Sequence, residues 1–238
     1  MTKKIFQWLG REFVALSGEG KSGGTATDQM QGIVHRFDEE LQSVGLSLEN
    51  TVRTRLWAVD RDSRHQASNV RFKMLSGKAR ASSTSFLSQD HFDSDARVAL
   101  DLIAMRPSRP GLEKKIVEYD PPKRPCRYVI YDSFVCLTGE EAETALQPPV
   151  LADQLVNILS LLGASLTHAG ASWDQAIKVS SFLHRAHSAE TLKGLFERNL
   201  KGAIPFMECV PVDGFAIQEG VSGGGEGLLE VEVTAKID

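Results

Sequence analysis

The chain has 238 residues, of which 42% are hydrophobic and 24% charged, and its formal net charge is −4. At about 150 residues per domain, this length predicts one large or two small domains, and the composition excludes a disordered or fibrous protein. Because no apolar run approaches the roughly 18 residues of a membrane helix and no basic tract is present, we expect neither a membrane nor a nucleic acid as partner.

The first half of the chain alternates between strand and helix patterns. Apolar runs that end at glycine indicate strands, and apolar residues spaced three to four apart indicate helices. The predicted elements are a strand over 13–18, a helix over 28–44, a turn and strand over 46–57, a helix over 63–75, and strands over 79–87 and 97–105. This order is typical of a small α+β domain with its helices on one face of a sheet.

The second half repeats the same order. Its predicted elements are a strand over 134–139, a helix over 153–169, a turn and strand over 171–182, a helix over 188–200, and strands over 206–212 and 228–237. The offset between matching positions grows from 121 (139 minus 18) to 131 (232 minus 101), so the copies differ mainly by loop insertions. We interpret the pattern as a duplication, and a chance similarity of α/β patterning is the alternative.

Five prolines separate the two halves and indicate a linker, because proline ends regular structure. The predicted organisation is a first domain over 1–106, a proline-rich linker over 107–125 and a second domain over 126–238. Three cysteines suggest no disulfide framework, and the N-terminal residues lack the long apolar stretch of a secretory signal. We therefore expect a cytoplasmic location.

Two motifs invite a cofactor or metal interpretation. Residues 18–23 match G-x-G-x-x-G between a predicted strand and helix, but the acidic residue that a dinucleotide site needs about 20 positions later comes far too late, near Asp60. His184 and His187 lie three residues apart, but no further ligands with zinc spacing are evident. A strand-to-helix loop and surface or hydrogen-bonded histidines are the preferred interpretations, and no cofactor or metal is expected.

Polar residues inside strand patterns are the best candidates for chemistry. Arg80, Cys209 and Glu232 fall in such patterns, although strand alternation alone permits a solvated face for each. Asp101 differs from these, because apolar residues flank it in the nearly continuous apolar run 98–104. A charge in that setting needs a partner or a function.

In the order of its elements, each half resembles the YjgF/RidA family, the reactive-intermediate deaminases. The resemblance rests on the Leu-Ser-Gly strand end at 16–18, the helix opened by a glutamine and closed by Gly45, the strand over 52–57 and the closing strand over 100–104. It implies two tandem chorismate-mutase-like α+β domains, each a β-sheet with two helices packed on one face. Family members hydrolyse enamines and imines derived from amino acids without a metal or organic cofactor, in pockets between neighbouring domains of a trimer.

The resemblance also implies a set of site residues. In the first copy Arg80 matches the arginine that grips the substrate carboxylate, Ser82 a frequent cysteine, Asn69 a pocket asparagine and Asp101 the last-strand glutamate. In the second copy Cys209 keeps the cysteine, Glu232 keeps the glutamate, Lys193 replaces the asparagine and Met207 replaces the arginine. Neither copy is complete, and the family's N-terminal pocket tyrosine has no clear match.

These residues predict a cofactor-independent hydrolase or deaminase acting on a small carboxylate-bearing metabolite, an enamine, an imine or a chorismate-like compound. A guanidinium offers two parallel donors to a carboxylate, and a sheltered carboxylate can transfer protons near neutral pH. Glu232 is the preferred acid–base residue, with Asp101 next. The alternative is a non-catalytic small-molecule-binding or regulatory protein with degenerate pockets. Because family domains close into rings of three, two domains per chain predict a homotrimer.

Overall fold

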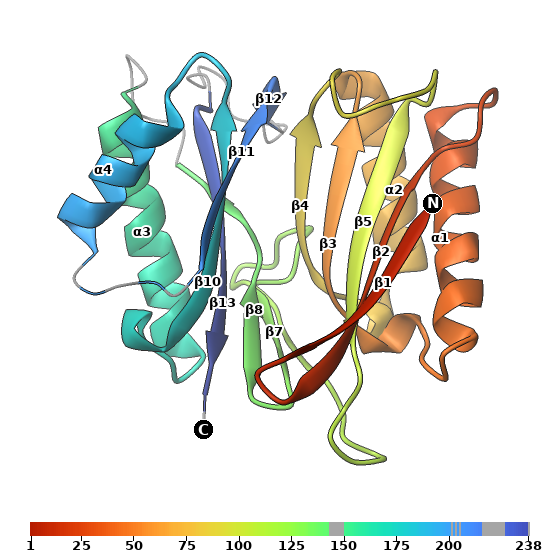
Figure 1. The fold of residues 1–238 in the computed structure, drawn as a ribbon, viewed down its shortest axis with the longest axis horizontal. Helices are drawn as coiled ribbons and strands as arrows, with labels where there is room; N and C mark the ends of the chain where they lie inside the picture. The colour runs from red at the N-terminus through yellow and green to blue at the C-terminus, as the bar shows by residue number, and fades with distance from the viewer. Residues whose placement is uncertain (143–149, 201, 203, 205, 216–226, 238) are drawn as a thin grey trace. The chain divides into compact units, whose positions relative to one another are not determined.

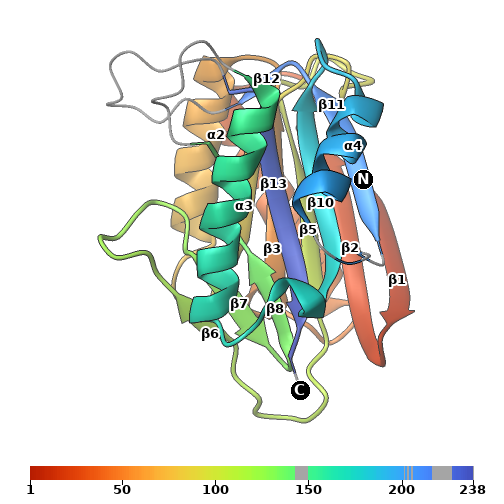
Figure 2. The ribbon, with the colours of Figure 1, turned by 90° about the vertical axis from the view of Figure 1, so that its left-hand side faces the viewer.

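The computed structural model describes residues 1–142, 150–200, 202, 204, 206–215 and 227–237. The chain divides into two compact units, unit 1 over Met1–Asp132 and unit 2 over Ser133–Asp238. Each unit has a sheet covered on one face by two helices, as Figure 1 and the turned view in Figure 2 show. The predicted fold class is therefore confirmed.

In unit 1 the last long strand lies in the middle of the sheet. The elements are β1 (Thr2–Trp8), β2 (Arg11–Glu19), α1 (Ala26–Gln42), the 3₁₀ turn η1 (Leu48–Asn50), β3 (Thr51–Ala58), α2 (Arg61–Met74), the 3₁₀ turn η2 (Gly77–Ala79), β4 (Ser82–Leu87), β5 (Val98–Met105), β6 (Lys115–Val117) and β7 (Tyr128–Tyr131). Within the unit, the strands of the main sheet follow the order β1-β2-β5-β3-β4. All neighbours in this order are antiparallel except β3 and β4, which are parallel.

Unit 2 repeats this arrangement. Its elements are β8 (Phe134–Leu137), β9 (Glu140–Glu141), α3 (Leu151–His168), the 3₁₀ turn η3 (Trp173–Gln175), β10 (Ala176–His184), α4 (Ala189–Asn199), β11 (Met207–Val212), β12 (Gly214–Phe215) and β13 (Leu229–Lys236). The order β11-β10-β13-β8 corresponds to β4-β3-β5-β2, and β10 and β11 are again the parallel pair. Strand β9 pairs with β13 as well.

A glutamine at the start of the first helix does the same work in both copies. The side-chain carbonyl of Gln29 accepts a hydrogen bond from the backbone N–H of Arg97 at 2.9 Å, and that of Gln154 accepts one from Leu228 at 2.8 Å. Both glutamines are buried, so each satisfies an amide that precedes the last strand of its copy. A Cβ at Gly20 would lie only 2.4 Å from Gln29 Oε1, which explains one glycine of the 18–23 motif by close packing alone.

The sequence patterns missed the short and edge strands. Strand β1 is largely exposed, so its residues show no apolar alternation, and its pairing with β2 depends on a tight turn in which Leu9 and Gly10 both have positive φ. The segment predicted as a linker contains the three-residue strand β6, which pairs with β7. The predicted domain boundaries stay predictions.

Neither a membrane span nor a metal cluster is found in the part of the chain that the structure describes. None of its helices is long and apolar enough to cross a membrane. Likewise, the described His, Cys, Asp and Glu side chains form no group of three or more that could hold a metal ion.

Candidate functional site

The face of the unit 1 sheet that points away from the helices carries a row of polar side chains. Val98, Leu100, Leu102 and Ala104 of β5 belong to the core shared with α1, so strand alternation places Asp101 on the opposite face. The strand register puts Asp101 beside Ser17 on one side and Arg55 on the other, with Thr84 next to Arg55. A carboxylate and a guanidinium thus occupy neighbouring positions in one row.

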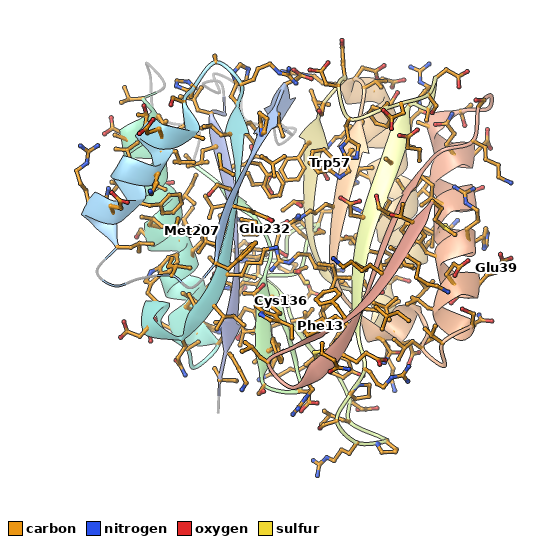
Figure 3. The ribbon with its side chains drawn as sticks, in the orientation of Figure 1. Phe13, Glu39, Trp57, Cys136, Met207 and Glu232 are labelled. Carbon is orange, nitrogen blue, oxygen red and sulfur yellow. The ribbon has the colours of Figure 1, made fainter. Side chains whose placement is uncertain are left out.

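Asp101 has the partner that its apolar surroundings require. Trp57 Nε1 donates a hydrogen bond to Asp101 Oδ2 at 2.7 Å. The Trp57 side chain is buried and lies on the face away from the helices (Figure 3). On Trp57, the imidazole of His91 stacks with a centroid distance of 4.1 Å and an interplanar angle of 9°. The indole of Trp57 therefore has the Asp101 carboxylate at its N–H edge and the His91 imidazole against its ring face.

The loop that carries His91 is fixed to the end of β2. Glu19 accepts hydrogen bonds from Ser94 Oγ at 2.6 Å and from the backbone N–H of Asp93 at 3.2 Å. Burial lowers the pKa of His91, against the opposing effect of the carboxylates of Asp101, Glu19 and Asp93. His91 is therefore a neutral imidazole at neutral pH and can accept a proton.

Arg80, the predicted carboxylate clamp, is bonded to the chain itself. It follows η2, and its Nη2 donates to Glu118 Oε2 and to the carbonyl of Arg124, each at 2.8 Å. The guanidinium also lies over the ring of Phe72, with Cζ 4.9 Å from the centroid. A carboxylate of the same protein thus occupies one donor of the predicted clamp.

The structure brings Asn69 near Arg80 but gives Ser82 a structural contact. Asn69 Oδ1 accepts from Arg124 Nη1 at 2.6 Å, so Asn69 and Arg80 both contact Arg124. Ser82 is fully buried and donates to the carbonyl of Val52 at 2.8 Å, a bond between β3 and β4. The residues that contact Arg80 differ from the residue that bonds Asp101, so the two side chains belong to separate clusters in unit 1.

In unit 2, Glu232 is 1% exposed and occupies the position that Asp101 has in unit 1. It lies beside Ser180, which lies beside Glu208, as Asp101 lies beside Arg55. Figure 3 shows Glu232 on the side of the sheet away from α3 and Met207 on the side of the helices. The matching register supports the alignment of the two acids that the repeat predicted.

The other predicted residues of the second copy do not gather around Glu232. Cys209 alternates with Glu208 along β11 and so lies on the helix side, as Met207 does. Cys209 is exposed, and partial burial of its sulfur raises the pKa of the thiol. Lys193 projects from α4 into solvent and lies 3.9 Å from Glu197. Cys209 and Lys193 therefore do not share a pocket with Glu232 among the residues that the structure describes.

Sequence reasoning did not single out Arg55, Trp57 or His91. The signal for the first two was present, because Arg53, Arg55 and Trp57 alternate with apolar residues and must share a face. His91 comes from an irregular loop, and no periodicity could have placed it on Trp57.

A cavity of about 380 Å³ in unit 2 lies apart from all of these residues. It is lined by Val156, Leu159, Ser160, Trp173, Asn199 and Leu200, and therefore belongs to α3, η3 and the end of α4. None of the predicted site residues contributes to its lining.

Comparison with known proteins bears on the fold. No protein-family model and no curated protein matches the chain. A crystal structure of a chorismatase matches 98% of this chain and 79% of its own length, with a TM-score of 0.65 and 10% identity. The chain has the chorismatase fold. The resemblance seen in the sequence is thus confirmed at the level of architecture.

Single-domain structures match about half of the chain. The Rid family protein YyfA from Yersinia pestis covers 52% of it, with 20% identity, 99% of its own length and a TM-score of 0.44. A YjgF family member from Neisseria meningitidis covers 53% of it, with 16% identity, 97% of its own length and a TM-score of 0.42. The chorismatase fold accounts for nearly the whole chain, whereas each of these accounts for about half.

Proposed function

We propose that this protein is a cofactor-independent hydrolase or deaminase that acts on a small carboxylate-bearing metabolite. The observation that carries the proposal is the arrangement around Trp57, whose indole N–H donates a hydrogen bond to Asp101 while His91 stacks on the face of the same ring. A carboxylate and a neutral imidazole held close together can take a proton from water and return it to a leaving group.

The reaction follows from these groups. For an imine, water adds to the carbon of the C=N bond while Asp101 or His91 accepts a proton from the attacking water. The same proton then moves to the nitrogen and gives a neutral addition product. Transfer of the hydroxyl proton of that product to the nitrogen, through the same groups, breaks the C–N bond and leaves a carbonyl compound and an amine. The enzyme contributes orientation and proton transfer, which is typically worth about 10²–10⁴-fold in rate.

Glu232 is the corresponding acid of unit 2 and stays in the proposal. Its longer side chain reaches further from the strand than that of Asp101, and it lies at the equivalent register position. The row around it contains Ser180 and Glu208 in place of a guanidinium. In this copy the second carboxylate, Glu208, is paired with Lys178 at 3.2 Å. Among the described residues, no guanidinium stands beside the acid as Arg55 stands beside Asp101. The surroundings therefore favour Asp101 for substrates that carry a carboxylate.

The test is turnover of enamines and imines generated from amino acids, and of chorismate, followed by release of ammonia or pyruvate. The wild-type protein is compared with Asp101→Asn and with Ser17→Ala, a neighbour in the same row that has no part in the proposed proton transfer. Loss of turnover in Asp101→Asn alone supports the proposal. Equal rates in all three proteins contradict it.

A non-catalytic binding protein is the second candidate. It is favoured by Arg80, which is bonded to Glu118 of the same chain. The register also gives Met207 the position that Ser83 has in the first copy rather than that of Arg80, so the predicted match of Met207 with the arginine is not supported. Saturable binding of small carboxylates with no turnover of any substrate would favour this candidate. We also propose that three chains assemble into a homotrimer, and light scattering that gives the mass of one chain would contradict it.

A further inference from the structure

The proline-rich segment between the predicted domains is bound to unit 1 along its length. This strap, defined here as residues 113–126, begins with an ion pair of 2.8 Å between Lys78 and Glu113. Its other end is held by Cys126 Sγ, which donates to the carbonyl of Ala81 at 3.4 Å. Between these ends, Glu118 and Arg124 contact Arg80 and Asn69. The two polar residues that the sequence assigned to a substrate pocket are therefore covered by the strap.

Glu118 satisfies Arg80 only in part. One oxygen, Oε2, accepts from Nη2 of Arg80, while Nε of Arg80 is buried and has no hydrogen-bond partner among the described residues. A free carboxylate can bind Nε and Nη2 together through two parallel hydrogen bonds. An external carboxylate would thus satisfy a buried donor that Glu118 leaves unsatisfied.

The middle of the strap has few contacts that would oppose its local detachment from unit 1. Its one strand, β6, has three residues, and Glu118 is exposed, with 43% of its side chain accessible. The apolar residues next to Glu118, among them Val117 and Tyr119, are only half-buried. Segments with few buried apolar contacts open locally more readily than the core.

We propose that Glu118 is an internal ligand of Arg80 and that the strap and a small carboxylate exclude each other from this site. The inference rests on the role of Arg80 as carboxylate clamp that the sequence predicted, and it adds the regulation of that site. The face of Phe72 under Arg80, with the Arg124 guanidinium 5.9 Å from the same ring, gives the site an aromatic floor. The two guanidiniums hold positive charge over this ring, so the ligand class is a small carboxylate.

Calorimetry with pyruvate as the probe tests the proposal, with methyl pyruvate as the uncharged control. Glu118→Gln removes the competing charge, and we expect it to bind pyruvate roughly 1.5- to fivefold more tightly than the wild type, the range that an exposed ion pair supports. The matched control is Glu113→Gln, which breaks the ion pair at the far end of the strap and leaves Arg80 untouched. Its affinity should rise less than that of Glu118→Gln, because the Lys78–Glu113 pair is exposed and stabilises the strap little.

A second measurement follows the strap itself. Hydrogen exchange of residues 113–126 in the wild type should rise when pyruvate is added and stay unchanged with methyl pyruvate. Equal affinity of Glu118→Gln and the wild type, absence of pyruvate binding to Glu118→Gln, or binding that survives in Arg80→Ala would each overturn the proposal. None of these measurements needs turnover, so failure of the hydrolase proposal at Asp101 is a separate result.

Discussion

The two sheets share a register but carry different chemistry on the face that points away from their helices. In unit 1, the row through the last long strand places Arg55 beside Asp101. In unit 2, the equivalent row places Ser180 beside Glu232, with Glu208 beyond it. The first row pairs opposite charges, and the second contains two acids.

This difference shows which part of a duplicated domain is free to change. The interior contacts are held in common, such as the glutamine at the start of the first helix and the parallel pair of strands at the end of the sheet order. Side chains on the opposite face do not take part in that core, so a change from arginine to serine leaves the backbone pairing intact. Scaffold and chemistry have therefore diverged separately.

The largest effect is expected on kcat, and it distinguishes the roles of Asp101 and Glu232. Asp101→Asn should lower kcat about 100-fold or more, because the amide keeps the shape of the carboxylate but cannot accept the proton. Glu232→Gln in the same assay shows whether unit 2 takes part. If Glu232→Gln loses the activity and Asp101→Asn retains it, the functional copy is the second one.

Because the two copies share the buried glutamine, we expect its removal to destabilise both of them. Gln29→Ala and Gln154→Ala should each lower the free energy of unfolding by about 1–3 kcal/mol, because each leaves a backbone N–H without its partner. Urea denaturation followed by circular dichroism measures both. A large cost in one copy and none in the other would show that the two glutamines are not equivalent.

His91 gives unit 1 a pH dependence of its stability. Its pKa is lowered in the folded protein, so the unfolded chain binds the proton more readily. The contribution of His91 to stability is complete above the ordinary histidine pKa of about 6.5 and is lost as the pH falls below it. The carboxylates of Asp101, Glu19 and Asp93 oppose this lowering of the His91 pKa, but burial has the larger effect.

The corresponding variant is His91→Gln. Between pH 7.5 and 5.5, its free energy of unfolding should fall less steeply than that of the wild type. Parallel curves for the two proteins would mean that His91 does not titrate differently in the folded and unfolded states.

The smallest effect is expected at Lys193. Lys193→Ala should change the free energy of unfolding by less than about 0.5 kcal/mol, because its contact with Glu197 is exposed and screened by solvent. The same variant tests the substrate-binding role that the sequence suggested. An unchanged KM would remove Lys193 from the site, and an increased KM would retain it.

Much of the fold could be predicted, because the same order of strand and helix patterns occurs in both halves of the sequence. The apolar spacing of α1 and α3 and the flanked acid in β5 were visible in the residues themselves. The site was harder to predict, since the contacts of Arg80 come from Glu118 and Arg124, which are 38 and 44 positions away. Loop residues such as His91 follow no periodicity, so only the folded chain shows what they contact.

The central position of β5 and β13 also shapes how the chain can fold during synthesis. The hydrogen bond of Gln29 needs a backbone amide 68 residues later in the chain, and that of Gln154 needs one 74 residues later. Until that strand arrives, β2 and β3 have no neighbour between them and expose unpaired edges. Since β5 ends at Met105 and β8 begins at Phe134, the first copy can close its sheet before the second begins to form. The duplication thus allows two closures in succession rather than one long-range closure over the whole chain.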